Sequence, residues 1–275
     1  MMFPKLMGIL NVTPDSFSDG GDNNGDAGAA AMLARVQALL NDGADIIDIG
    51  AESTRPGATV LNVDEEWQRL EGILPEAISR IHAAGKQVSV DTRHPETAAR
   101  AIGLGVDTIN DVSGCTNPQM LAVLADSSCD IIFMHSLTIP ADKSITLPED
   151  VDVIEALKAF AAERAAECEA LGIKKERLIF DPGIGFGKTA KQSIDILKRA
   201  PDLNRLGELG LKLLIGHSRK SFLAEFTDCP ATERDSLTLA VSQYLLQHSV
   251  DIIRVHNVAL HHELFQLTHA LHALK

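Results

Sequence analysis

The stretch Gly43-Ala44-Asp45-Ile46-Ile47 recurs in outline along the chain, and each copy joins the end of a helix-like segment to a short apolar strand. The related stretches are Gly105-Val106-Asp107-Thr108-Ile109, Cys129-Asp130-Ile131-Ile132 and Val250-Asp251-Ile252-Ile253. Glycine is typical of a helix end, and a short apolar run is typical of a buried strand. The repeat therefore predicts a chain in which helices and parallel strands alternate.

Eight strand-like segments can be traced, and a helix-like segment follows each one. The expected strands are 6–10, 45–49, 87–91, 107–110, 130–134, 178–181, 211–215 and 251–256. The expected helices are 27–41, 64–84, 95–104, 118–125, 150–171, 191–206, 232–247 and a last one reaching 273. Eight strand–helix units predict a single-domain α/β protein, a (β/α)8 TIM barrel over residues 1–275. An open doubly wound sheet is the alternative, but no Gly-x-Gly-x-x-Gly motif follows the first strand.

The composition excludes several classes of protein. The chain has 275 residues, of which 45% are hydrophobic, and a formal net charge of −13, which argues against binding to nucleic acids or anionic membranes. No apolar run approaches the length of a membrane span, and Met1–Lys5 leads straight into a strand without a signal peptide. The four cysteines form no Cys-x-x-Cys pair, so we expect reduced thiols and a cytoplasmic protein.

Polar residues follow nearly every expected strand, and in such barrels the active site lies at the carboxyl ends of the strands. The candidates at these ends are Asn11, Asp91, Asn110, Asp181, Lys220, Ser221, Arg254 and His256. Strand ends are generally more polar than strand centres, which explains an isolated serine or aspartate. It does not explain two carboxylates on opposite sides of a barrel that also presents a lysine and an arginine, unless they pair or bind a ligand.

The chemistry of this set indicates two kinds of ligand. Carboxylates with an amide and a lysine suit a planar, nitrogen-rich heterocycle, because a carboxylate can accept two N–H bonds from one edge of the ring. Arg254, His256 and Asn11 suit a diphosphate, and Asn11 could also hold a Mg²⁺ ion that bridges its oxygens. Backbone N–H groups at Ser221 could bind a second anion such as a carboxylate. Together these features favour displacement of pyrophosphate by a nucleophile.

Two motifs come close to known patterns without matching them. Gly187-Lys188-Thr189 resembles the end of a phosphate-binding P-loop, but Pro182 stands where that motif needs its first glycine. His262-Glu263 is not continued as His-Glu-x-x-His, so a zinc protease is excluded. We expect the late histidines to form an exposed helix face: His261, His262, His269 and His272.

The motifs taken together resemble the dihydropteroate synthase family, whose members join 6-hydroxymethyl-7,8-dihydropterin diphosphate to p-aminobenzoate in folate biosynthesis. They span the chain in the family's order: 8–21, 52–57, 90–92, 109–111, 181–188, 218–221 and 253–256. The resemblance implies a Mg²⁺-dependent transferase that is a sulfonamide target and a homodimer built through its last helices. Its partners would be small-molecule substrates.

The resemblance also implies roles for individual residues. The pterin diphosphate would be bound by Thr54, Asp91, Asn110, Asp181, Lys220, Arg254 and His256. The p-aminobenzoate would be bound by Phe17, Arg55, Pro56, Phe186 and Ser221. Catalysis would involve Asp91, Lys220 and the loop carboxylate Asp19, and Asn11 would be the Mg²⁺ ligand.

Two other functions are compatible with a pterin-binding barrel: a corrinoid-dependent methyltransferase and an inactive pterin-binding protein. The first would not need the 8–21 loop, and the second would have lost Asp91, Lys220 or Arg254, all of which are present. The chain departs from the common family pattern at Ser136-Leu137-Thr138 and at Asn257, where a carboxylate is usual. These positions leave open how the fifth loop packs and what replaces the carboxylate.

Overall fold

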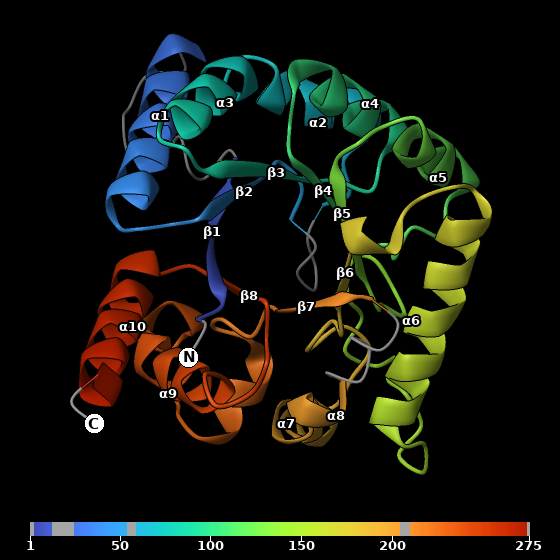
Figure 1. Ribbon diagram of the computed structural model, residues 1–275, viewed down its shortest axis with the longest axis vertical. Coiled ribbons are helices and arrows are strands. Elements are labelled where there is room, and N and C mark those ends of the chain that lie inside the picture. Colours follow the sequence, from blue (N-terminus) through green and yellow to red (C-terminus); the bar gives the residue numbers. More distant parts are fainter. Residues whose placement is uncertain (1–2, 13–24, 54–58, 204–209, 274–275) are drawn as a thin grey trace.

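In the computed structural model, which describes residues 3–12, 25–53, 59–203 and 210–273, eight parallel strands close into a barrel in chain order (Figure 1). The strands are β1 (Lys5–Asn11), β2 (Ile46–Gly50), β3 (Gln87–Asp91), β4 (Thr108–Asp111), β5 (Asp130–Met134), β6 (Leu178–Asp181), β7 (Lys212–Ile215) and β8 (Ile252–Val255). Pairing of β1 with β8 closes the ring. The predicted TIM barrel is confirmed, and the open doubly wound sheet is excluded.

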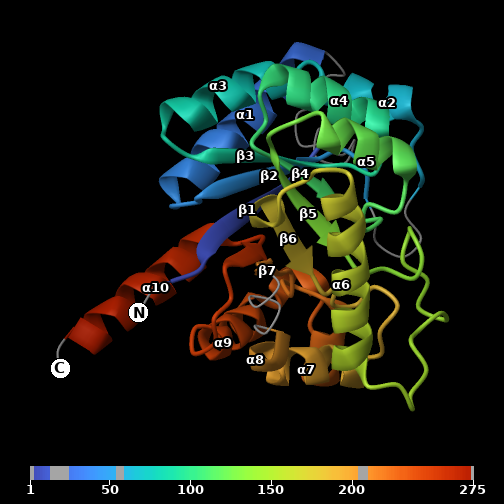
Figure 2. The same cartoon turned by 45° about the vertical axis from the view of Figure 1, so that its right-hand side comes forward.

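Helices surround the strands on the outside of the ring (Figure 1). They are α1 (Gly25–Asn41), α2 (Val63–Leu70), α3 (Leu74–Ala83), α4 (Pro95–Leu104), α5 (Pro118–Ala125), α6 (Val153–Ala170), α7 (Ala190–Lys198), α8 (Ala200–Leu203), α9 (Asp235–Leu245) and α10 (Val258–Ala273). The start of the chain lies along α10, where the Phe3 and Phe265 rings stack with centroids 5.4 Å apart. Figure 2 shows the far end of α10 projecting from the barrel.

Two predicted helices are each divided in the structure. The helix predicted at 64–84 is α2 followed by α3, because Gly72 interrupts it and Pro75 has no N–H to continue the ladder of hydrogen bonds. The helix predicted at 191–206 is α7 followed by the four-residue α8, which has Pro201 in its first turn. The helix predicted at 232–247 begins later, at Asp235, after a short 3-10 turn at Ala231–Glu233.

The core has two parts. The larger lies between the strands and the helices, and a smaller apolar layer fills the barrel interior: Met7, Ile46, Ile132, Ile179, Leu214 and Ile252. Because successive inward-facing positions on a strand are two residues apart, the next layer toward the carboxyl ends contains Asp48, Asn110 and Arg254. The barrel therefore has an apolar floor with a polar layer directly above it.

The recurring aspartate of the repeat ties neighbouring strands together. In three copies one carboxylate oxygen accepts the backbone N–H of a residue on the neighbouring strand, and that residue's carbonyl accepts the aspartate N–H in return. The pairs are Asp45 with Leu6 at 3.0 Å, Asp107 with Val88 at 2.8 Å and Asp251 with Leu213 at 2.7 Å. The fourth copy differs, because Asp130 contacts the Lys212 ammonium at 3.3 Å. The repeat thus marks where four of the eight strands, β2, β4, β5 and β8, join the barrel.

The histidines of α10 are not all exposed, so that prediction is wrong for His261. Its side chain is buried, with Nε2 2.8 Å from Ser242 Oγ and Nδ1 2.6 Å from the Asn257 carbonyl. His269 and His272 are exposed as expected. All four cysteines are free thiols. Within the described part of the chain, no helix has the length and apolar character needed to cross a membrane.

The aspartate–strand pairing predicts a loss of stability in Asp251→Ala. The substitution leaves the N–H of the buried Leu213 without its side-chain acceptor, which should lower the free energy of unfolding by about 1–3 kcal/mol. Urea denaturation would measure this change. The control is Asp126→Ala at the exposed end of α5, which should shift stability by no more than about 0.5 kcal/mol. Equal effects in the two variants would contradict the proposed role of the repeat.

Candidate active site

A cavity of about 420 Å³ opens at the carboxyl ends of the strands. Nine residues that the sequence indicates as site residues line it: Asn11, Asp91, Asn110, Asp181, Phe186, Lys220, Ser221, Arg254 and His256. They come from β1, β3, β4, β6 and β8 and from the segments that follow β6, β7 and β8. The other candidates, Phe17, Asp19, Thr54, Arg55 and Pro56, lie outside the described residues.

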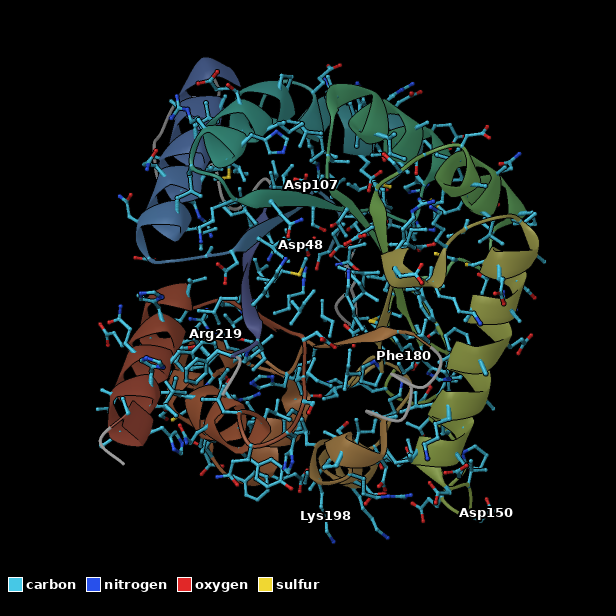
Figure 3. All side chains as sticks on the ribbon, viewed as in Figure 1. Asp48, Asp107, Asp150, Phe180, Lys198 and Arg219 are labelled. Atoms are coloured by element: carbon cyan, nitrogen blue, oxygen red, sulfur yellow. The ribbon has the colours of Figure 1, made fainter. Side chains whose placement is uncertain are left out.

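The floor of the cavity holds a buried ion network centred on Arg254. Its Nε donates to Asp48 Oδ2 at 2.6 Å, and one of its terminal nitrogens donates to Asp91 Oδ2 at 2.9 Å. Asn110 Nδ2 also donates to Asp48 Oδ2, at 3.1 Å. Asp48, labelled in Figure 3, is fully buried, whereas the Arg254 side chain remains 20% exposed. One guanidinium therefore faces two carboxylates beneath the cavity.

This arrangement makes Asp91 hard to ionise. Burial and the neighbouring charge of Asp48 raise the pKa of Asp91 to about 8, although the Arg254 guanidinium opposes the shift. Asp48 Oδ1 is a buried oxygen without a hydrogen-bond partner, so the network is not fully satisfied by the protein alone. A carboxylate pair that shares one cation is well suited to respond to a ligand that brings positive charge.

The opposite wall contains a further carboxylate, Asp181, and Lys220. Asp181 Oδ1 accepts the Gly183 N–H at 2.8 Å, and burial raises the pKa of Asp181, while the Lys220 charge lowers it. Lys220 Nζ donates to the Ile184 carbonyl at 2.6 Å and lies 4.3 Å from the centre of the Phe186 ring. The lysine is therefore held between a carbonyl and an aromatic face.

The strand-seven and strand-eight ends form the third side. His256 Nδ1 lies 2.9 Å from Ser218 Oγ, which also accepts the His256 backbone N–H at 3.2 Å. Arg219, which follows Ser218 and is labelled in Figure 3, has a left-handed φ of 59°. Its Nε and one terminal nitrogen donate to the two carboxylate oxygens of Asp235, at 2.6 and 2.8 Å. These contacts fix the backbone that carries Lys220 and Ser221.

The departure at Asn257 has a structural explanation. Asn257 Nδ2 donates to Asp235 Oδ2 at 3.0 Å, and its Oδ1 accepts the Leu260 N–H in the first turn of α10. An aspartate at this position could not donate the first of these bonds and would face another carboxylate. The carboxylate that pairs with Arg219 therefore comes from the start of α9, and the asparagine supports it.

The fifth loop, the other departure, packs against the sixth. The Leu147 N–H donates to the Gly187 carbonyl at 2.9 Å, and Gln192 Nε2 donates to the Leu147 carbonyl at 3.1 Å. Ala141 and Lys143 of this loop line the cavity. The loop thus contributes part of the cavity wall even though its sequence differs from the common pattern.

Several site residues were not found by sequence reasoning. Asp48 is the most important, and its signal was a charged residue inside an otherwise apolar strand, between Ile47 and Ile49. Lys143 and Arg234 line the cavity from loops that no short motif identifies. Lys188 lies in the 181–188 family motif, but the sequence gives it no role of its own.

Asn11 is the residue that could hold a metal ion. Within the described residues, no group of three or more histidine, cysteine, aspartate or glutamate side chains is arranged to bind one. Mg²⁺ is commonly held by one or two protein oxygens together with substrate phosphates and water. A single amide oxygen at the end of β1, on the wall of a cavity that also holds Arg254 and His256, fits that kind of shared site.

Comparison with known proteins places the chain in a family. The model of the family described as "Pterin binding enzyme" matches residues 7–256, which is most of the chain. The chain belongs to the pterin-binding enzyme family. Within this family it is similar to the dihydropteroate synthase of Neisseria meningitidis serogroup C, with 40% identity over 258 residues that cover 93% of this chain and 88% of the relative.

Solved structures of this family agree with the fold. A dihydropteroate synthase from Anaplasma phagocytophilum with bound 6-hydroxymethylpterin-monophosphate has a TM-score of 0.87 and 37% identity, covering 98% of this chain and all of that one. The Xanthomonas albilineans dihydropteroate synthase with 4-aminobenzoic acid has a TM-score of 0.87 and 36% identity, covering 98% and 94%. The resemblance seen in the motifs is confirmed over nearly the whole chain.

The ion network predicts that Asp48 controls the ionisation of Asp91. Removing the Asp48 charge in Asp48→Asn should lower the pKa of Asp91 from about 8 toward the ordinary range of a carboxyl group, since that charge is the second largest cause of the shift. Carbon-13 NMR titration of the Asp91 carboxyl carbon would measure both values. The control is Asp195→Asn in α7, a half-buried carboxylate that does not line the cavity, and an Asp91 pKa that is the same in all three proteins would contradict the network described above.

Proposed function

We propose that the chain condenses 6-hydroxymethyl-7,8-dihydropterin diphosphate with p-aminobenzoate, giving 7,8-dihydropteroate and pyrophosphate. The observation that carries this proposal is the convergence of nine indicated residues on one cavity, with a carboxylate–lysine wall and an arginine–histidine corner. The ligands named for the Anaplasma and Xanthomonas relatives, a pterin monophosphate and 4-aminobenzoic acid, are consistent with two neighbouring subsites.

The pterin ring is proposed to lie between Asp91 and Asn110 on one side and Asp181 and Lys220 on the other. The amino-amidine edge of a pterin presents two N–H donors, which a carboxylate such as Asp181 can accept together. Asn110 offers both an acceptor and donors to the remaining ring edge. Thr54 is proposed to contact the same substrate from the second loop.

The diphosphate is proposed to bind at Arg254, His256 and Asn11. Arg254 supplies a guanidinium whose planar fork matches phosphate oxygens, and its pairing with two carboxylates holds it in place before the substrate arrives. A Mg²⁺ ion held by Asn11 would neutralise charge on the diphosphate oxygens. These residues would bind the leaving group and stabilise its negative charge.

The p-aminobenzoate is proposed to bind beside Phe186 and Ser221, with Phe17, Arg55 and Pro56 added from the two loops. The Phe186 ring gives an apolar face for the benzene ring, and Lys220 lies against the same ring at 4.3 Å. Ser221 opens a five-residue 3-10 helix at the edge of the cavity and is exposed to an incoming carboxylate. Sulfonamides are expected to compete for this subsite.

The reaction is proposed to begin with the departure of pyrophosphate. The bond between the pterin methylene carbon and the diphosphate oxygen breaks, and its electron pair leaves with that oxygen. The positive charge left on the pterin is stabilised by ionised Asp91, and the amine nitrogen of p-aminobenzoate then bonds to the methylene carbon and loses a proton. Charge stabilisation and positioning would each contribute several kcal/mol, on the order that preorganised sites provide. Asp19 is proposed to take part in catalysis, as the family resemblance implies.

The proposal is tested by mixing the protein with the pterin diphosphate, p-aminobenzoate and Mg²⁺ and measuring pyrophosphate and dihydropteroate. Equal amounts of the two products are expected. Pyrophosphate formation without p-aminobenzoate incorporation, or no turnover at all, would contradict the proposed function.

Asp91→Asn should lower kcat by about 100-fold, because it removes a charge interaction made mainly in the transition state. The wild-type kcat/KM for the pterin diphosphate should rise with pH and level off above about 8, since Asp91 must be ionised to stabilise the cation. The variant should lack this rise. Steady-state kinetics between about pH 6 and 9 would measure both effects.

The homodimer is proposed to form through α10 and its neighbour α9. Three large side chains on these helices are well exposed: Tyr244 at 41%, Leu267 at 59% and Leu271 at 62%. Leu267 and Leu271 lie in the C-terminal half of α10. Leu267→Glu combined with Leu271→Glu should give a monomer by analytical ultracentrifugation, whereas an unchanged oligomer would place the interface elsewhere.

A further inference from the structure

The loop after β6 has little conformational preference of its own. Gly183, Gly185 and Gly187 all have a left-handed backbone, with φ of 65°, 80° and 68°. Glycine adopts this conformation without strain but also loses the most conformational freedom when it is fixed. Ile184 and Phe186 stand between these glycines, and both contact Lys220. Since the glycines themselves do not restrict the backbone, hydrogen bonds to the rest of the protein must hold these two residues in place.

Lys188 supplies three of these bonds. Its Nζ lies 2.8 Å from His135 Nδ1, 2.9 Å from the His135 carbonyl and 2.9 Å from the Phe186 carbonyl. Burial lowers the pKa of Lys188 well below its usual range, and the nearby Asp181 carboxylate opposes that shift. In its charged form the side chain has three N–H donors, which match the three acceptors. Burial, together with the nearby Lys188 charge, lowers the pKa of His135 to about 3, so its ring is neutral near pH 7 and Nδ1 can accept a bond.

The direction of Lys188 distinguishes this loop from the P-loop that its sequence resembles. A P-loop lysine reaches the phosphates of its ligand. Here the lysine is 6% exposed, does not line the cavity, and points its nitrogen at the end of β5. Its bonds are to the protein, so its effect on a ligand must be indirect.

That indirect effect reaches two residues of the site. Lys188 holds the Phe186 carbonyl, and the ring of the same residue lies under the Lys220 ammonium at 4.3 Å. Two residues earlier in the loop, the Ile184 carbonyl accepts from Lys220 Nζ at 2.6 Å. A shift of the loop would therefore move the aromatic face and the lysine together.

We propose that Lys188 is a positioning residue that fixes the Gly183–Lys188 loop to the end of β5, so that Phe186 and Lys220 are held in place for the attacking amine. This inference rests on the proposed function, because it assigns Phe186 to the p-aminobenzoate subsite. Arg254, Asn11 and His256, which are proposed to bind the diphosphate, lie on other strands and should not depend on Lys188.

The test is Lys188→Met, which keeps most of the buried side-chain volume and removes all three donors. KM for p-aminobenzoate should rise about 10-fold and kcat should fall about 10-fold, since displacements near 1 Å at a reacting site can cost about 100-fold in rate. The inhibition constant of pyrophosphate should stay within about two-fold of the wild-type value, because the diphosphate subsite is unaffected. Unchanged KM and kcat for the variant would overturn the inference.

Arg177→Met is the matched control. Arg177 donates to the Cys129 and Leu124 carbonyls and to Ser127 Oγ, and it does not line the cavity. It should lose stability while keeping wild-type KM and kcat. If both variants change the kinetics in the same way, or if the pyrophosphate constant changes as much as the KM in Lys188→Met, Lys188 has only a general structural role and the inference fails.

If Lys188→Met does not fold, Lys188→Gln provides the same comparison, since its amide retains two donors and should give a smaller rise in KM for p-aminobenzoate. A folded Lys188→Gln variant whose KM for p-aminobenzoate equals the wild-type value would contradict the proposal. Failure of the proposed function is a different result, because the wild-type protein itself would then release no pyrophosphate.

Discussion

The pairing of Arg254 with two buried carboxylates is the interaction on which the rest of the site depends. Asp48 is fully buried in the barrel interior and Asp91 lies at the cavity with 14% of its side chain exposed, so an unpaired carboxylate at Asp48 would be strongly destabilising. One guanidinium stabilises both and still reaches the cavity with 20% of its side chain exposed. The same residue therefore makes the polar layer of the barrel possible and provides a cation for an anionic ligand.

The barrel explains how such a network can exist within a single domain. The apolar layer of Met7 and Ile46 and its neighbours closes the floor, so the charged layer above it contacts protein below and the cavity above. The repeated aspartates fix the opposite end of the strands through backbone N–H groups. Stability and chemistry are thus divided between the two ends of the barrel, as is usual for this fold.

Much of this arrangement could be predicted from the sequence, because it follows from local patterns. The strand–helix repeat predicted the barrel, and the polar strand ends predicted eight residues that line one cavity, to which the family resemblance added Phe186. Asp48 was missed because the strand pattern shows which residues share a face but not what that face contacts. Its partner, Arg254, lies 206 positions further along the chain. The break at Gly72 was missed because the apolar spacing continues across it, although Pro75 carried the signal.

The remaining misses depend on contacts between loops. The bonds of Lys188 to His135 and the pairing of Arg219 with Asp235 join elements that are distant in the chain, and no short motif encodes them. The asparagine at position 257 is a similar case, since it is explained only by its hydrogen bond to Asp235 at the start of α9. Sequence patterns identified the groups that face the ligand better than the groups that hold them in place.

The central claim, that Arg254 stabilises the buried carboxylates, is tested most directly by a double-mutant cycle of Arg254→Met and Asp48→Asn read as the free energy of unfolding. Arg254→Met alone should cost about 3–5 kcal/mol, because it leaves the buried Asp48 carboxylate without its cation. Asp48→Asn in that background should recover part of the loss, giving a coupling energy above about 1 kcal/mol. Effects that add to within about 0.5 kcal/mol would contradict the account.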